Sequence, residues 1–124
     1  MAKEKTPEQF KNSAKYVKYI DLARNPDNYK SKEVTFTGKV IQTLESGHTV
    51  ALRVNVSKGK YGIWQDTIFV NYRRSEGEGR LLENDIVTLW GTVEGLKTYK
   101  TILRSDVTIP EINAKYITIN GNEK

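Results

Sequence analysis

A single glycine inside an otherwise regular strand pattern is the feature that most constrains the fold of this chain. Residues 33–43 alternate in character, with Val34, Phe36 and Val40 on one face, and this period of two predicts a strand. Gly38 interrupts the apolar face. A glycine weakens a strand but lets it bend sharply, because no side chain clashes at the corner. The long first strand of a five-stranded, partly open Greek-key barrel requires such a bend.

Four more strand patterns follow, separated by turn signals at short intervals. They are predicted at residues 49–57, 63–73, 86–93 and 107–119, and residues 94–106 are expected to form an extra hairpin. Gly91 is expected to bend the fourth strand as Gly38 bends the first, and Pro110 indicates an edge or bulge position because it has no N–H to donate. Five short strands with frequent turns predict a mainly β fold, a five-stranded barrel of the OB type.

The N-terminal part of the chain has a helical pattern instead. Residues 7–24 are predicted to form one α-helix, with Thr6 as N-cap and Pro7 at the first helical position. This helix is expected to pack on the barrel through Phe10, Val17 and Ile20. The predicted organisation is therefore an N-terminal helix and connection at 1–32, the OB-like barrel at 33–118, and a flexible tail at 119–124.

The net charge of +5 suggests nucleic acid as a partner, so its location matters. Residues 1–32 hold eight Lys and Arg against four Asp and Glu, whereas residues 33–124 hold twelve against eleven. The basic excess therefore belongs to the N-terminal segment, and the predicted barrel is almost neutral. A barrel that follows phosphates should be clearly basic in its own body.

Catalytic chemistry is not expected from this sequence. The chain has no cysteine, which excludes thiolate nucleophiles and disulfides, and its only histidine, His48, falls in a predicted turn. No glycine-rich phosphate loop is present, and the acids of the polar connection are expected to be solvated. These acids are Glu76, Glu78, Glu83 and Asp85. The sequence predicts a protein that is not an enzyme and that carries no cofactor or metal.

A candidate binding surface combines aromatic and basic residues. OB barrels bind ligands on the face of their second and third strands and on the loops between strands 1–2 and 4–5. Interleaved rings and cations suit single-stranded nucleic acid, because bases stack on the rings while Lys and Arg contact phosphates. The predicted ligand-binding residues are Lys39, Arg53, Asn55, Lys58, Lys60, Tyr61, Trp64, Phe69, Asn71, Arg73, Arg74, Tyr99 and Lys100. Phe69 and Trp64 also fit a structural role, the first under the N-terminal helix and the second at a barrel end.

Three stretches of the sequence carry a family resemblance. They are YIDLARNPDNYKSKEVTFTGKVIQT, RLLENDIVTLWGTVEGLKTYKTI and VTIPEINAKYI. They resemble a family of small OB-fold domains of Gram-positive bacteria, similar to the tRNA-anticodon-binding-like group and often part of secreted or lipid-anchored proteins. The resemblance covers roughly residues 17–118, and it departs from the family pattern at Ser31, where the family has Gly, and at Trp90, where it has Tyr.

The resemblance implies an exported, extracytoplasmic domain whose leader is not contained in this sequence. Without such a leader the chain would stay in the cytoplasm, and its first ten residues lack the apolar stretch of a signal peptide. The first hypothesis for function is a non-enzymatic binding module for a protein partner or an envelope polymer. The alternatives are a single-stranded DNA or RNA binder that uses the strand 2–3 face, and a structural domain of a larger assembly. No run of apolar residues is long enough to span a membrane.

Overall fold

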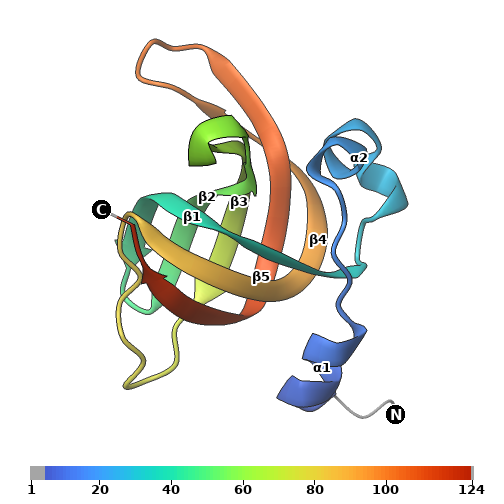
Figure 1. Cartoon of the computed structure of the whole chain (residues 1–124), viewed down its shortest axis with the longest axis vertical. Coiled ribbons are helices and arrows are strands. Elements are labelled where there is room, and N and C mark those ends of the chain that lie inside the picture. The colour runs from blue at the N-terminus through green and yellow to red at the C-terminus, as the bar shows by residue number, and fades with distance from the viewer. Residues whose placement is uncertain (1–4, 124) are drawn as a thin grey trace.

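The strands close into a barrel, as predicted. The computed structural model describes residues 5–123, and its five strands form a closed barrel in the order β1-β2-β3-β5-β4 (Figure 1). The strands are β1 (Glu33–Ser46), β2 (Thr49–Lys58), β3 (Trp64–Arg73), β4 (Asp85–Lys100) and β5 (Asp106–Asn122). A short 3-10 turn, η2 (Lys60–Gly62), lies between β2 and β3. This architecture is that of an OB-like fold.

The barrel closes through one parallel seam. All other neighbouring strands pair antiparallel, whereas β3 and β5 run parallel and pair only at Phe69–Glu111, Val70–Ile112 and Asn71–Asn113. The first half of β1 pairs with β4 and its second half pairs with β2. β1 therefore belongs to both halves of the barrel and must bend where it changes partner.

Gly38 and Gly91 lie where two backbones approach too closely for any side chain. A Cβ built on Gly38 would lie 2.2 Å from the carbonyl oxygen of Asn55 on β2. One built on Gly91 would lie 2.2 Å from the carbonyl oxygen of Asn113 on β5. Gly38 directly precedes Lys39, the residue at which β1 begins to pair with β2. Close backbone approach therefore requires glycine at both positions, and at Gly91 the β4–β5 register also shifts.

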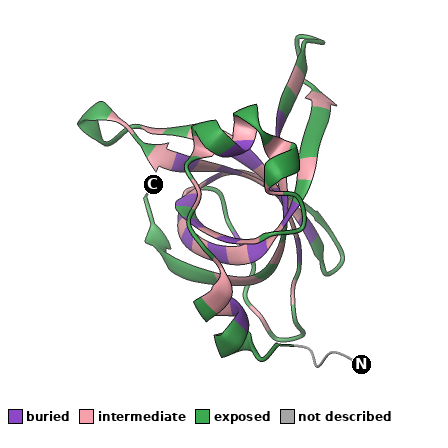
Figure 2. Ribbon diagram, turned by 90° about the vertical axis from the view of Figure 1, so that its right-hand side faces the viewer, coloured by how far each residue is buried: buried purple, intermediate pink, exposed green. Residues whose placement is uncertain are grey.

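The alternation along the strands builds the core. On β2 the side chains of Val50, Leu52, Val54 and Val56 are all buried, as predicted, and Figure 2 shows many of the buried positions on the strands that form the ring. Leu22 from the N-terminal segment and Leu81 from the β3–β4 connection join the same cluster. Segments outside the strands therefore complete the interior of the barrel.

The prediction of a single N-terminal helix at residues 7–24 is wrong. The chain forms α1 (Pro7–Ser13) and α2 (Tyr19–Arg24), followed by the 3-10 turn η1 (Pro26–Asn28). Thr6 does cap α1, because its side chain accepts a hydrogen bond from the backbone N–H of Gln9. Between the helices, the N–H of Lys15 donates to the carbonyl of Glu33, and the N–H of Thr35 donates to the carbonyl of Lys15. Pairing with β1 therefore replaces helical hydrogen bonds in this segment.

The break also changes which side chains of this segment are buried. Phe10 is buried and Val17 packs against the core, as predicted. Ile20 was predicted to be buried and is instead 53% exposed, whereas Leu22 is fully buried. The short second helix starts anew at Tyr19, so its inward face differs from the face that one continuous helix would present.

The last two strands are longer than predicted. The expected extra hairpin is the continuation of β4 and β5, which pair from Gly95–Glu111 out to Lys100–Asp106. We call this projecting part, residues 94–111, the arm; it extends beyond the barrel in Figure 1. At the other end, residues 119–122 were assigned to a flexible tail but pair with the start of β4, as in Asn122 with Asp85.

Candidate binding groove

A groove runs between the outer face of the barrel and the arm. It has a volume of about 700 Å³, within the range typical of ligand sites. β1 and β2 contribute Gln42, Leu44 and Arg53, and β3 contributes Phe69. The arm and its tip contribute Tyr99, Lys100, Thr101, Ile102, Leu103 and Ser105. Strands far apart in sequence therefore share this groove.

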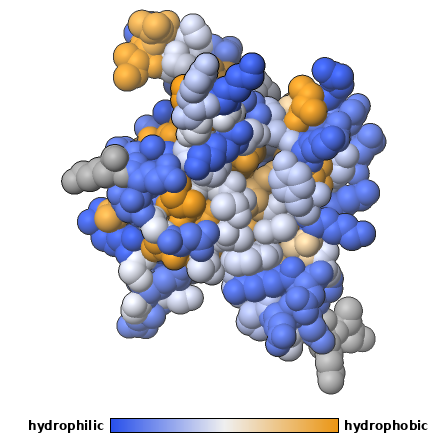
Figure 3. Space-filling view, viewed as in Figure 1, coloured by the Kyte–Doolittle hydropathy of each residue, from blue (hydrophilic) through white to orange (hydrophobic). Residues whose placement is uncertain are grey.

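The groove has an apolar wall that is open to solvent. Leu44 is 57% exposed, Ile102 is 100% exposed and Leu103 is 88% exposed. Figure 3 shows the hydrophobic side chains at the far end of the arm. Single exposed aliphatic residues are common, but three that line one groove form a patch of the kind that marks interaction sites.

Arg53 is the cation at the centre of the groove. Its Nε donates to Oε1 of Gln42 at 2.6 Å, and its Nη1 donates to the hydroxyl of Tyr99 at 3.0 Å. Both partners are neutral, and Arg53 forms no ion pair within residues 5–123. The side chain is therefore held in place from two sides while its positive charge stays uncompensated. Such a fixed guanidinium suits a carboxylate or phosphate group of a ligand.

Two aromatic rings accompany this arginine. The ring centroids of Phe69 and Tyr99 lie 6.5 Å apart, and the ammonium group of Lys97 lies 5.5 Å from the Phe69 centroid. Phe69 was predicted to bind ligand, with a structural place under the N-terminal helix as the alternative, and it lines the groove together with residues of the strands and the arm. Lys100 lies at the groove but forms an ion pair with Asp106 at 3.1 Å, so its charge is largely balanced.

A second hollow brings together three other predicted residues. Lys39, Asn55 and Trp64 line a space of about 440 Å³ with Ile63 and Glu123. Trp64 is half-buried, its Nε1 donates to Oε1 of Glu123 at 3.2 Å, and the Lys58 ammonium lies 5.3 Å from its ring centroid. Next to it, Lys60 and Tyr61 belong to η2, and Tyr61 is 97% exposed. Trp64 therefore lies on the outside of the barrel.

Arg73 and Arg74 lie at the opposite end of β3. With His48, Ser75 and Glu76 they line a third hollow of about 360 Å³. Arg74 pairs with Glu45 at 3.4 Å, whereas Arg73 is exposed and forms no ion pair within the described part of the chain. His48 is an exposed turn residue, as predicted.

Asn71 and two of the acids predicted to be solvated have structural partners. Asn71 donates to Oε2 of Glu111 at 2.8 Å and to Oδ1 of Asn113 at 2.9 Å. Glu78 accepts a hydrogen bond from the Tyr72 hydroxyl at 2.6 Å, and burial together with this contact raises the pKa of Tyr72. Asp85 is buried and accepts from the backbone N–H of Leu82. Glu78 and Asp85 are thus not solvated, because each binds donors of its own loop or of a neighbouring strand.

The structure thus divides the thirteen predicted residues. Arg53, Phe69, Tyr99 and Lys100 share the groove, and the others lie in two separate hollows or along the strand face. Sequence reasoning missed the apolar members Leu44, Ile102 and Leu103. The adjacent Ile102 and Leu103, inside a segment that is otherwise polar, were the sequence feature that could have indicated them.

Across residues 5–123 no group of three His, Cys, Asp or Glu side chains is placed to hold a metal ion. No helix in that range is long and apolar enough to cross a membrane.

Comparison with known proteins supports the fold alone. No protein-family model and no curated protein matches the sequence. An aspartyl-tRNA synthetase from Entamoeba histolytica aligns over the whole chain with 17% identity and a TM-score of 0.61, and the alignment covers 25% of the synthetase. OBody AM3L09, solved bound to hen egg-white lysozyme, aligns over 90% of the chain and 100% of its own length with 21% identity and a TM-score of 0.56. The mitochondrial single-stranded DNA-binding protein Rim1 of S. cerevisiae aligns over 76% of the chain and 99% of its own length, with 10% identity and a TM-score of 0.49, which is too low to support an argument.

Proposed function

We propose that this chain is a non-catalytic OB-fold binding module that holds an apolar, acid-bearing segment of a protein partner in the groove. The observation that carries the proposal is Arg53, a fixed and uncompensated cation inside an exposed apolar wall. A carboxylate of the partner would pair with Arg53, and flanking apolar side chains would cover Leu44, Ile102 and Leu103.

The composition of the groove supports binding rather than catalysis. Its aliphatic hydroxyl side chains are Thr101 and Ser105, and its lining includes no histidine or carboxylate that could act as a base toward them. Thr101 is also engaged locally, because its Oγ1 accepts a hydrogen bond from the backbone N–H of Ser105. These hydroxyls therefore shape the arm tip.

One observation favours single-stranded nucleic acid as the alternative ligand. The paired rings of Phe69 and Tyr99 beside Arg53 and Lys97 could stack bases and contact phosphates. The balanced charge of Lys100 and the almost neutral barrel argue against it, because phosphate contacts need several available cations. Export from the cell, which the family resemblance implies, stays a prediction, as does an envelope polymer as the ligand.

Selection from a phage-displayed library of short random peptides tests the proposal. We expect enriched peptides to combine an acidic residue with apolar neighbours and to bind the purified protein in fluorescence anisotropy. Arg53→Met should weaken that binding by roughly 10–100-fold, the range expected when a charge-assisted hydrogen bond is lost. Arg73→Met is the matched control, because Arg73 is an exposed arginine outside the groove, and it should bind as the wild type does.

Two results would overturn the proposal. Selected peptides that bind Arg53→Met as well as the wild type would show that the groove cation is not the recognition element. Tight binding of labelled oligo-dT or oligo-U, with a steep dependence on salt concentration, would establish the nucleic-acid alternative instead.

A further inference from the structure

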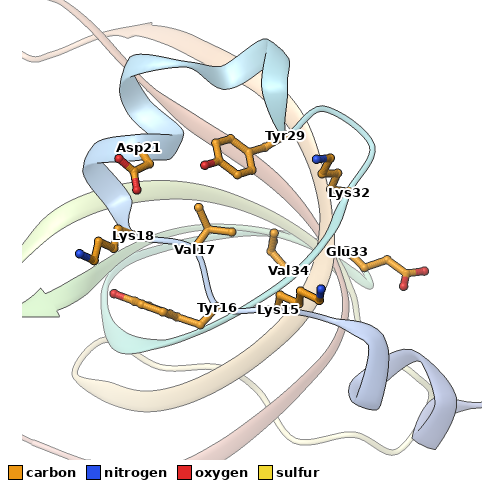
Figure 4. A pocket seen from close by; sticks show the side chains of 9 residues that line it. All are labelled: Lys15, Tyr16, Val17, Lys18, Asp21, Tyr29, Lys32, Glu33 and Val34. Atoms are coloured by element: carbon orange, nitrogen blue, oxygen red, sulfur yellow. The ribbon is translucent and has the colours of Figure 1, made fainter.

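The broken N-terminal helix creates one more cavity, separate from the groove and from the two hollows described above. Residues 14–18 run extended beside β1, held by the hydrogen bonds of Lys15 with Glu33 and Thr35. This segment, Asp21 of α2, the turn at residues 29–32 and the start of β1 line an open hollow of about 440 Å³, which we call the linker pocket. Figure 4 shows Tyr29 on one side of this space and Tyr16 on the other. A continuous helix over these residues would not leave this arrangement.

The floor of the linker pocket is apolar and continuous with the core. Val34 is buried, and Val17 and Tyr29 are partly buried and pack against the core cluster. Figure 4 places Val17 and Val34 side by side beneath the Tyr29 ring. The pocket thus offers two branched aliphatic side chains and the Tyr29 ring on its floor, with Tyr16 opposite, a surface that suits a flat apolar group.

The rim of the pocket is basic on one side. Lys15 and Lys32 lie on the same side of the pocket in Figure 4, whereas Lys18 and Asp21 lie on the other side. None of these three lysines forms an ion pair within residues 5–123. Two carboxylates also line the pocket, Asp21 on the side of Lys18 and Glu33 on the side of Lys15 and Lys32.

Glu33 is already occupied by other partners. Its carboxylate accepts from the ammonium group of Lys5 at 2.6 Å and from the hydroxyl of Ser13, and these contacts hold its pKa below the usual value. Figure 4 shows this carboxylate directed away from the pocket. Lys15 and Lys32 consequently present two positive charges without a compensating carboxylate beside an apolar floor.

The backbone of this rim is fixed in a costly conformation. Ser31 has a φ of 68°, in the left-handed region, where a residue other than glycine pays roughly 1–2 kcal/mol. The turn is anchored because the N–H of Ser31 donates to the carbonyl of Val93, and the N–H of Val93 donates to the carbonyl of Lys32. Strain of this kind is often retained where a site must be held in place.

We propose that the linker pocket binds a small organic anion with a flat apolar body. Its carboxylate or phosphate group would contact Lys15 and Lys32, and its body would lie on Val17 and Val34 against the Tyr29 ring. The lining fits this class of ligand because it joins cationic and apolar surfaces within one small cavity. This site is independent of the groove, whose lining shares no residue with it.

Titrations followed by 15N–1H NMR test the inference, with phenyl phosphate, benzoate, inorganic phosphate and phenol as probes. We expect phenyl phosphate or benzoate to produce saturable chemical-shift changes at the amides of residues 15–18 and 29–34. Whichever of the two probes binds more tightly identifies the preferred anionic group. Inorganic phosphate and phenol, each lacking one half of the ligand, should bind at least about tenfold more weakly, since each loses one type of contact.

Matched substitutions distinguish binding in the linker pocket from a general electrostatic attraction of anions to the basic surface. Lys32→Gln and Lys15→Gln should each weaken binding of the organic anion by at least about threefold, and the double variant by more. Lys30→Gln is the control, because this substitution removes the same charge from an exposed lysine that does not line the pocket. The inference is overturned if no organic anion gives saturating shifts in this region. Equal weakening by Lys30→Gln and Lys32→Gln would overturn it too, because it would indicate a diffuse charge effect.

Discussion

Replacing Gly38 by alanine tests the close approach at which β1 changes partner. The new Cβ would lie 2.2 Å from the carbonyl oxygen of Asn55, and ordinary contact begins near 3.4 Å. The two backbones would therefore have to separate by more than 1 Å where the pairing of Lys39 with Asn55 begins. Overpacking of this type costs about 1–3 kcal/mol, and each stretched ladder hydrogen bond adds about 0.5–1.5 kcal/mol. We expect the free energy of unfolding to fall by roughly 2–4 kcal/mol.

Urea denaturation followed by tryptophan fluorescence measures this change, with Gly121→Ala as the matched control. Gly121 also lies in a strand, but a Cβ built on it meets nothing within 4 Å. Both substitutions lower the conformational entropy of the unfolded chain, which raises the free energy of unfolding by about 0.4–1 kcal/mol in each case. This contribution cancels when the two variants are compared. If Gly38→Ala unfolds at the same urea concentration as Gly121→Ala, with an unchanged slope, the argument from close approach is wrong.

Two further predictions concern side chains outside the groove. Trp64→Ala should cost about 1–2 kcal/mol of stability in thermal denaturation, because Trp64 is half-buried, and a loss of the 3–5 kcal/mol typical of core aromatics would contradict its place on the surface. Tyr72→Phe should make stability less dependent on pH above the ordinary tyrosine value of 10.0, as measured by urea denaturation in that range. The folded protein holds the Tyr72 proton more tightly than the unfolded chain, so the wild type loses stability as pH rises past that value, and equal pH profiles would refute this role.

The barrel was predictable because its signals are local. The alternation of β2 fixes which side chains face inward, and Gly38 and Gly91 interrupt their strand patterns visibly, although the close approach that requires them involves residues distant in sequence. The break in the N-terminal helix was not predictable in the same way. The helical pattern of residues 7–24 is real, but Lys15 gains hydrogen bonds to β1 that the local pattern does not reveal.

The candidate site was only partly predictable, because it depends on strand length and on position along the strand. Alternation correctly placed Arg53 and Phe69 on the outer face, where they pair across β2 and β3. It did not show that Trp64 and Arg73, at opposite ends of β3, belong to different hollows. The arm was predicted as an extra hairpin that contributes Tyr99 and Lys100 to the binding surface, but its apolar tip was not expected to form a wall of the groove.

The parallel seam between β3 and β5 has a consequence for how fast the barrel forms and opens. Three residue pairs join segments about 40 positions apart in sequence, whereas fifteen pairs join the consecutive strands β4 and β5. Contacts across a long chain separation are slow to form, and this applies to the seam and also to the β1–β4 ladder, whose paired residues lie even farther apart in sequence. The seam has only three pairs against the seven of the β1–β4 ladder, so it is expected to open first in the native protein. Phe69 belongs both to this seam and to the groove. A partner that contacts Phe69 would therefore stabilise the closed seam and slow amide exchange at residues 69–71 and 111–113, while exchange in the rest of the β4–β5 ladder would be almost unaffected.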